Sequence, residues 1–129
     1  MTSSAFSINT LVPTAAFHLV RGTPKIYTIL SESKREYTLN ICPDCGSALW
    51  IDGGLPGMKI LKSGVLDGND ALEQEGVKPL SEQFTVRRAS WVCLISGASQ
   101  SDTQSSRKDV DKMLVQLGAG EVASLASGE

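Results

Sequence analysis

Two cysteines separated by two residues, Cys42 and Cys45, are the residues whose types and spacing point most directly to chemistry. The segment 42–46 reads Cys-Pro-Asp-Cys-Gly and follows a strand-like run. Proline fixes φ within a turn, and glycine after the second cysteine allows the left-handed conformation that lets the chain fold back. Such a turn can direct both sulfur atoms at one cation, and zinc takes four ligands, with sulfur at about 2.3 Å. The pattern therefore predicts half of a zinc site.

Two other interpretations of this pair stay open. A redox-active Cys-x-x-Cys pair usually lies at a helix N-terminus, which lowers the thiol pKa, whereas residues 47–51 have the pattern of a strand. The third interpretation is a pair of structural thiols without a metal. For further zinc ligands the sequence offers only Cys93, in an apolar run typical of a protein core, and His18, whose alternation with apolar neighbours is typical of an exposed strand residue.

The elements that must position the pair are predicted to be short β-strands. Alternating or β-branched runs, separated by Pro, Gly and polar turns, predict strands at 5–11, 25–30, 37–41, 48–51, 58–61, 82–86 and 91–95. Turn residues at 52–54 are expected to end the strand 48–51. The run 91–95 is apolar throughout and is typical of a strand buried on both faces, so Trp91 is expected in the core.

The end of the chain has a different composition. Residues 96–106 are rich in Ser and polar side chains and predict a linker. Apolar residues at helical spacing then predict a short helix at 107–117, with Ser106 or Asp109 as its N-cap. The fold class expected is mainly β, with a C-terminal linker and one short helix.

Length, charge and cysteine count exclude several classes. A chain of 129 residues is the size of one domain. Its 12 basic and 14 acidic residues give a net charge of −2, which argues against nucleic acid as a partner. No apolar run approaches the roughly 20 residues of a membrane span, and the N-terminal segment lacks the pattern of a signal peptide. Three cysteines, an odd number, favour a reducing compartment, the cytoplasm.

A series of segments, taken in chain order, resembles one protein family. They are Ser4-Ala5-Phe6, Val12-Pro13 with Phe17, Gly22–Lys25 with Tyr27, Cys42–Ser47 with Leu49-Trp50, Gly64–Asp67, and Phe84 with Arg87, Arg88 and Trp91. Together they resemble the Gfa family, which includes glutathione-dependent formaldehyde-activating enzymes and CENP-V-like proteins, over most of Ser3 to Gln100. The resemblance implies a small zinc-binding fold of packed antiparallel sheets (the Gfa-like β-tent), zinc as cofactor, and carbon–sulfur lyase chemistry on glutathione–aldehyde adducts.

The resemblance also implies cysteines that this sequence does not contain. The family's Cys-x-Cys pair of the structural zinc site and its Cys-x-Cys-x-x-Cys cluster of the catalytic zinc precede the residues that match Ser4-Ala5-Phe6. We therefore expect a Gfa/CENP-V-like domain at 1–100 without its opening strands and a flexible tail at 101–129. The expected metal ligands are Cys42 and Cys45, no residue is assigned a catalytic role, and this chain is expected to have little or no lyase activity.

The alternative function is a non-catalytic zinc-binding or protein-interaction domain. Candidates for substrate binding are Arg87 and Arg88, which suit the carboxylates of a glutathione-like molecule, and Trp50, which can line a cleft. The competing interpretations are a solvated strand end for the arginines and a core position for Trp50. Expected partners are glutathione or a thiol adduct, and a second copy of the chain through an unpaired sheet edge, with no membrane or nucleic acid.

Overall fold

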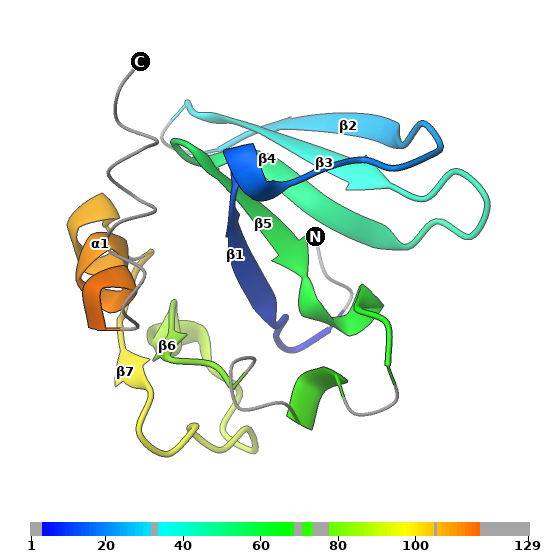
Figure 1. Ribbon diagram of the computed structural model, residues 1–129. Coiled ribbons are helices and arrows are strands. Elements are labelled where there is room, and N and C mark those ends of the chain that lie inside the picture. The colour runs from blue at the N-terminus through cyan, green and yellow to red at the C-terminus, as the bar shows by residue number, and fades with distance from the viewer. Residues whose placement is uncertain (1–3, 32–33, 69–70, 74–77, 105, 117–129) are drawn as a thin grey trace.

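The protein is built around one antiparallel β-sheet (Figure 1). The computed structural model describes residues 4–31, 34–68, 71–73, 78–104 and 106–116. The strands are β1 (Asn9–Pro13), β2 (Lys25–Leu30), β3 (Glu36–Ile41), β4 (Ala48–Leu55) and β5 (Met58–Lys62), in the order β1-β5-β4-β3-β2. Strands β2 to β5 follow one another as an antiparallel meander, and β1 pairs with β5 at the other edge of the sheet. The predicted mainly β fold class is confirmed.

The glycines of β4 extend the strand instead of ending it. The segment 52–54 was expected to be a turn, but β4 continues to Leu55 and the turn falls at Pro56–Gly57. Gly53 has φ of 84°, and a Cβ at this position would meet the backbone oxygen of Glu36 on the neighbouring strand. The predicted turn was wrong because glycine here allows a close approach of β4 to β3, in a stretch where the pairing of β4 with β5 is irregular.

The register of the strands sorts their side chains onto two faces. One face carries Leu11, Leu39, Ile51 and Ile60, and the other carries Thr10, Asn40, Trp50 and Leu61. Among the described residues, the buried apolar side chains are Trp50, Met58 and Val110. Within the described ranges, many apolar side chains of the sheet are therefore only half-buried.

The second half of the chain differs from the prediction. The strand expected at 82–86 is reduced to β6 (Ser81–Glu82), which pairs in parallel with β7 (Ser99–Gln100). Phe84 then adopts a left-handed conformation, with φ of 56°, and the 3₁₀ helix η5 (Thr85–Arg87) follows. The expected packing of two antiparallel sheets is thus not seen in the described part of the chain, where the second sheet is this short parallel pair.

The apolar run 91–95 forms turns and irregular structure, so the predicted strand was wrong. Trp91 is 72% exposed, which also contradicts its expected place in the core. Apolar composition does not make a strand unless neighbouring strands supply partners for its backbone N–H and C=O groups. At 91–95 the structure provides no such neighbour within the ranges that it describes.

The C-terminal helix is present as α1 (Arg107–Gln116), while Leu117 lies outside the described residues. Ser106 is its N-cap: the Asp109 N–H donates to Ser106 Oγ at 3.3 Å, and Asp109 Oδ2 accepts the Ser106 N–H at 3.0 Å. This reciprocal pair is a capping box. Val110 is 1% exposed, so the helix packs against the rest of the protein. No helix of the described residues has the length and apolar character needed to cross a membrane.

Candidate functional site

The Cys42–Cys45 pair lies in the turn that joins β3 to β4, as the sequence predicted. The turn is closed by two backbone hydrogen bonds, in which the Cys42 N–H donates to Ser47 O at 2.8 Å and the Gly46 N–H donates to Cys42 O at 3.0 Å. Gly46 has φ of 77°, a conformation that glycine adopts without strain. The local sequence therefore builds a compact strand–turn–strand unit that carries both thiols.

The two thiols of this turn differ in their exposure and partners. Cys45 donates to the hydroxyl of Ser47 at 3.2 Å and is exposed, while Cys42 is half-buried. The pKa of the Cys45 thiol is lowered, first by hydrogen bonds to the side chain and backbone of Ser47 and then by a hydrogen bond to the Cys42 thiol. A thiolate is the form of cysteine that binds a metal. The turn thus has two sulfur donor atoms, and the thiolate form is favoured at Cys45.

Neither of the other candidate ligands joins this pair. All three cysteines and the one histidine of the sequence lie in described parts of the structure, and the cysteines form no disulfide. Cys93 is exposed in the irregular segment 91–95 and not in the core, and His18 lies in an extended loop after η1 (Thr14–Ala16). No group of three or more His, Cys, Asp or Glu gathers among the residues that the structure describes. Cys42 and Cys45 are thus two sulfur atoms, fewer than the four ligands that a tetrahedral zinc site needs.

The surroundings of the turn bear on the redox interpretation. Cys42 directly follows β3, and the turn leads through Ser47 into β4, so no helix begins at the pair. The helix N-terminus that activates a redox Cys-x-x-Cys is therefore missing here. The geometry argues against the redox pair and is compatible with both a metal-binding turn and a pair of structural thiols.

A polar cluster that the sequence analysis missed lies on the central strands. Asp52 Oδ2 accepts Asn40 Nδ2 at 2.9 Å and Trp50 Nε1 at 3.0 Å, while Asp52 Oδ1 pairs with Lys59 Nζ at 2.5 Å. Burial raises the pKa of Asp52, but the hydrogen bonds from Lys59, Trp50 and Asn40 outweigh it, so the pKa is lowered overall. The one signal in the sequence was a polar residue beside apolar ones in each strand, Asn40 next to Leu39 and Ile41 and Asp52 next to Ile51.

The same cluster defines the environment of Trp50. The indole is 8% exposed, its ring centroid lies 4.9 Å from that of Phe17, and Lys59 Nζ lies 5.7 Å from it. Lys59 Nζ also lies 4.9 Å from the centroid of the Phe17 ring, within cation–π range. Trp50 thus occupies a packed and hydrogen-bonded place in the sheet, in keeping with the core interpretation.

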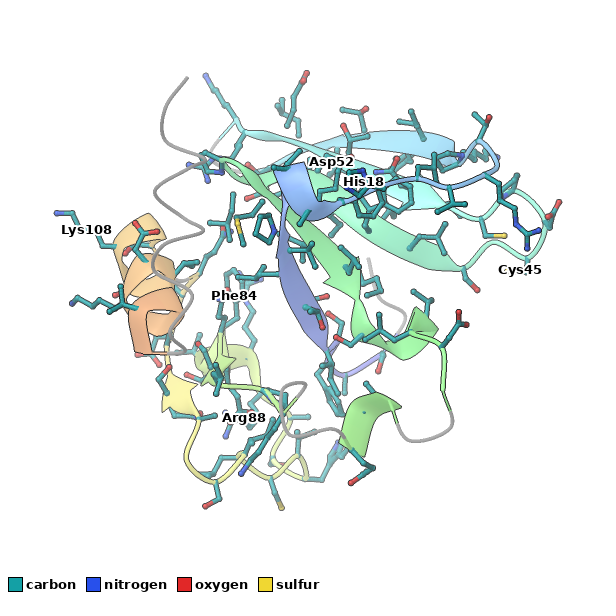
Figure 2. The ribbon with its side chains drawn as sticks, in the orientation of Figure 1. His18, Cys45, Asp52, Phe84, Arg88 and Lys108 are labelled. Carbon is teal, nitrogen blue, oxygen red and sulfur yellow. The ribbon has the colours of Figure 1, made fainter. Side chains whose placement is uncertain are left out.

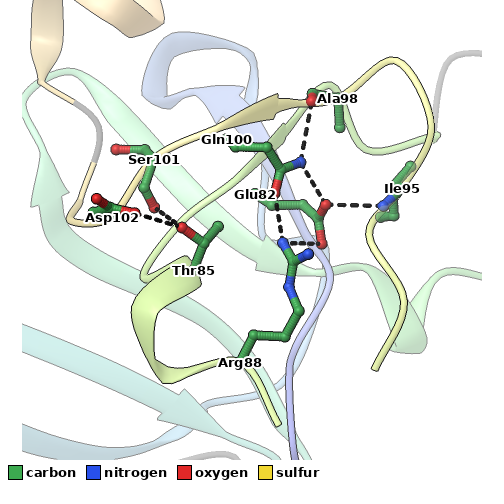
Figure 3. Close-up of polar contacts among 8 residues, drawn as sticks. All are labelled: Glu82, Thr85, Arg88, Ile95, Ala98, Gln100, Ser101 and Asp102. Atoms are coloured by element: carbon green, nitrogen blue, oxygen red, sulfur yellow. Dashed lines mark hydrogen bonds and ion pairs between the residues drawn. The ribbon is translucent and has the colours of Figure 1, made fainter. Parts of the chain in front are cut away.

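Arg88 takes part in a network that ties the segment after β5 together (Figure 3). Its Nη2 lies 3.2 Å from Glu82 Oε1 and donates to Gln100 Oε1 at 2.5 Å. Glu82 Oε2 in turn accepts Gln100 Nε2 at 2.6 Å and the Ile95 N–H at 2.9 Å. The guanidinium of Arg88 therefore already binds a carboxylate of its own chain, whereas Arg87 in η5 is exposed.

The candidate substrate-binding arginine and the cysteine turn lie far apart. Figure 2 shows Cys45 at the tip of the β3–β4 turn, on the opposite side of the molecule from Arg88 and Phe84. The structure thus does not bring Arg88 and the cysteine pair into one site. The cysteine turn and the Asp52 cluster are separate features of the same sheet.

We compared the sequence of this chain with models of known protein families. A family model described as "Glutathione-dependent formaldehyde-activating enzyme" matches residues 1–87 of the 129-residue chain. The chain belongs to this family. The match covers all five strands of the antiparallel sheet and the Cys42–Cys45 turn, and it ends at Arg87, before β7 and α1. Neither the curated proteins nor the solved structures give a significant match to the chain.

Proposed function

We propose that this protein is a zinc-binding member of the Gfa family, in which Cys42 and Cys45 donate thiolates to the metal. The observation that carries the proposal is the closed turn between β3 and β4, which holds both cysteines within four residues. Two sulfur ligands and no helix at the pair suit a structural zinc half-site. We take the metal to be zinc from the resemblance to the family, and the family's description, which names glutathione, supports glutathione or a thiol adduct as the partner.

The reaction class that follows from the family is carbon–sulfur lyase chemistry on glutathione–aldehyde adducts. Such chemistry uses zinc as a Lewis acid to polarise the substrate. Beyond Cys42 and Cys45, this sequence has one cysteine, Cys93, and one histidine, His18, and the structure brings neither to the pair. We therefore expect the 129-residue chain to show activity near the uncatalysed rate. Its compartment is proposed to be the cytoplasm, where thiols stay reduced.

The second candidate function is a non-catalytic zinc-binding or interaction domain. It is favoured by the edge strand β2, on which Ile26, Tyr27 and Leu30 are 61%, 62% and 63% exposed. An edge strand with exposed apolar side chains offers its backbone to another chain. A homodimer through this sheet edge is the interaction proposed for it.

Metal analysis of the purified protein tests the proposed function. The wild type is expected to bind zinc after reduction and dialysis, and Cys42→Ser and Cys45→Ser are expected to lose it, because the thiolates are the ligands. Cys93→Ser is the matched control and should keep its zinc, since Cys93 lies in a different segment. A wild type without zinc, or unchanged zinc in Cys42→Ser, contradicts the proposal.

An activity assay separates the two candidate functions. The 129-residue chain is mixed with glutathione, formaldehyde and zinc sulfate, and the formation of the adduct is followed. A rate near the uncatalysed condensation supports the non-catalytic function for this chain. Turnover well above that rate, abolished in Cys42→Ser, shows that the cysteine turn belongs to an active site.

A further inference from the structure

The serine at position 90 follows two consecutive arginines. The segment 86–92 reads Val-Arg-Arg-Ala-Ser-Trp-Val, so Arg87 and Arg88 stand three and two residues before Ser90, and Trp91 comes directly after it. No other serine or threonine of the sequence has arginine at both of these positions. Two guanidinium groups at a fixed spacing before a hydroxyl group form a pattern that carboxylates of another protein can recognise through bidentate ion pairs.

The structure places this hydroxyl group on the surface. Ser90 is exposed, and its neighbour Trp91 is 72% exposed. The Val92 N–H donates to Ala89 O at 2.9 Å, so Ser90 and Trp91 occupy the two central positions of a tight turn. The Ser90 side chain has no hydrogen-bond partner among the described residues. An enzyme can therefore reach the hydroxyl by opening this turn, without breaking a side-chain contact of Ser90.

We propose that Ser90 is phosphorylated by a protein kinase whose substrate groove carries carboxylates, with Arg87 and Arg88 as the residues that this groove recognises. In the reaction, the Ser90 hydroxyl oxygen forms a bond to the γ-phosphorus of ATP, and the bond between that phosphorus and the departing ADP oxygen breaks. The hydroxyl proton passes to a carboxylate of the kinase and then to solvent. The products are phosphoserine and ADP, and no oxidation or reduction takes place.

The two arginines differ in their availability to a kinase. Arg87 lies in η5 and is exposed. Arg88 Nη2 lies 3.2 Å from Glu82 Oε1 and donates to Gln100 Oε1 at 2.5 Å (Figure 3). A carboxylate of the kinase must therefore replace Glu82 as the partner of Arg88. Because this exchange conserves an ion pair, and because partly exposed ion pairs are weak, the contact with Glu82 is a small obstacle to recognition.

A phosphate group on Ser90 changes the same network. Phosphoserine carries a charge of about −1.5 to −2 at pH 7 and three acceptor oxygens. Arg88 lies two residues before Ser90, so the phosphate competes with Glu82 for its guanidinium. Glu82 also accepts the Ile95 N–H with its side chain and the Ser101 N–H with its backbone oxygen. Phosphorylation is therefore expected to loosen the pairing of β6 with β7.

Phosphorylation of the full 129-residue chain tests the site. The protein is incubated with Mg²⁺, ATP and the catalytic subunit of cyclic AMP-dependent protein kinase, whose substrate groove is acidic, and mass spectrometry measures the rate and the position of phosphate incorporation. Phosphate is expected at Ser90, and Ser90→Ala should remove it. Arg87→Ala and Arg88→Ala should each lower kcat/KM by about tenfold or more. Arg21→Ala, at an exposed loop position, is the matched control and should leave kcat/KM unchanged.

A destabilised variant shows whether the kinase acts on the folded protein. Gly22→Ala places a side chain at φ of 83°, so the unfolded fraction of the chain rises, although position 22 lies in another segment than Ser90. Opening of the turn 89–92 is a local event, so Gly22→Ala should be phosphorylated at the rate of the wild type. A rate that rises together with the unfolded fraction overturns the accessible site.

The remaining outcomes are equally decisive. Absence of incorporation, phosphate at another residue, or an unchanged rate in Arg87→Ala overturns the proposal. Because Arg87 is exposed, this variant decides the matter even if Arg88→Ala does not fold. In the phosphorylated protein, hydrogen exchange at the amides of Ile95 and Ser101 should be faster than in the unmodified protein. Equal exchange rates in the two forms overturn the competition between the phosphate and Glu82.

Discussion

The carboxylate of Asp52 accepts the indole N–H of Trp50, two residues earlier on β4, at 3.0 Å. The same oxygen accepts the amide of Asn40 on β3, and the other oxygen pairs with Lys59 on β5. One carboxylate thus joins three adjacent strands on one face of the sheet. Because Trp50 and Asn40 are both buried, their donors have little access to water as a replacement partner.

Removal of this carboxylate is expected to destabilise the fold. Asp52→Ala removes the acceptor of the buried Trp50 N–H and the shortest hydrogen bond of Asn40 Nδ2, at a cost of about 1–3 kcal/mol in the free energy of unfolding. Urea unfolding followed by Trp fluorescence measures the change. Asp67→Ala, at an exposed position, is the control and should change stability by less than about 0.5 kcal/mol. Equal effects of the two substitutions would show that the cluster has no special role in stability.

The same group predicts how stability depends on pH. The pKa of Asp52 is lowered in the folded state, so its ionised form adds stability above the unfolded pKa of about 3.9, and this stability is lost as the pH falls through the lower folded value. Asp52→Asn removes the titrating group. We expect its stability to fall less steeply than that of the wild type below about pH 4. Parallel curves for the two proteins, from acid to neutral pH, would contradict the assignment.

Two glycines with nearly equal φ allow the stability cost of backbone strain to be measured apart from the cost of a steric clash. Gly22 and Gly53 have φ of 83° and 84°, but a Cβ at Gly22 meets open space, whereas one at Gly53 meets Glu36 O. Gly22→Ala is expected to cost about 1–2 kcal/mol for the left-handed conformation alone. Gly53→Ala should cost about 1–3 kcal/mol more, because β3 and β4 must move apart. Thermal unfolding of both variants measures the difference, and similar losses would mean that the strands yield easily.

The network around Glu82 predicts a local effect of substitution. Glu82→Ala removes the acceptor of the Ile95 N–H and of Gln100, so the pairing of β6 with β7 should loosen. Hydrogen exchange is expected to speed up at the amides of Ile95 and Ser101 and to stay unchanged at β3 and β4. Glu73→Ala, at an exposed position of η3 (Ala71–Glu73), is the control. A uniform change over the whole sheet would show that this segment unfolds together with it.

The exposed edge strand predicts concentration-dependent association without metal. Ile26→Lys places a charge on β2 and should lower self-association of the zinc-free protein, because a charged edge resists pairing with another strand. Val20→Lys is the matched control: Val20 is 92% exposed but lies in a loop, so this substitution should leave association unchanged. Sedimentation velocity at several concentrations measures both. Equal behaviour of the two variants would exclude pairing through β2.

Local sequence predicted those elements whose signals are contained in a few neighbouring residues. The strand at 25–30 was predicted with the bounds that the structure has, since β-branched and aromatic residues follow a Gly-Thr-Pro turn. The cysteine turn and the Ser106 cap are equally local. In contrast, β4 was cut short because glycine reads as a turn signal wherever it occurs, although Gly53 here serves contact with β3.

The features that were missed depend on contacts between distant segments. Asn40 and Asp52 meet only because of the register between β3 and β4, which no single run of residues specifies. Ser81 pairs with Ser99 across a long irregular loop, and neither has the composition of a strand. The prediction for Trp91 failed for a related reason. Its large aromatic side chain favoured a buried position, but the tertiary structure leaves it exposed.

The pairing of β1 with β5 has a consequence for the order of folding. Strands β2 to β5 are joined by short connections. In contrast, Asn9 of β1 pairs with Lys62 of β5, and the whole meander lies between these two residues in the sequence. Contacts between nearby residues form faster than contacts that must close a long loop. We therefore expect the meander to form first and β1 to add last. Until it does, β5 is an edge with unpaired backbone groups, and aggregation of the newly made chain competes with this final step of folding.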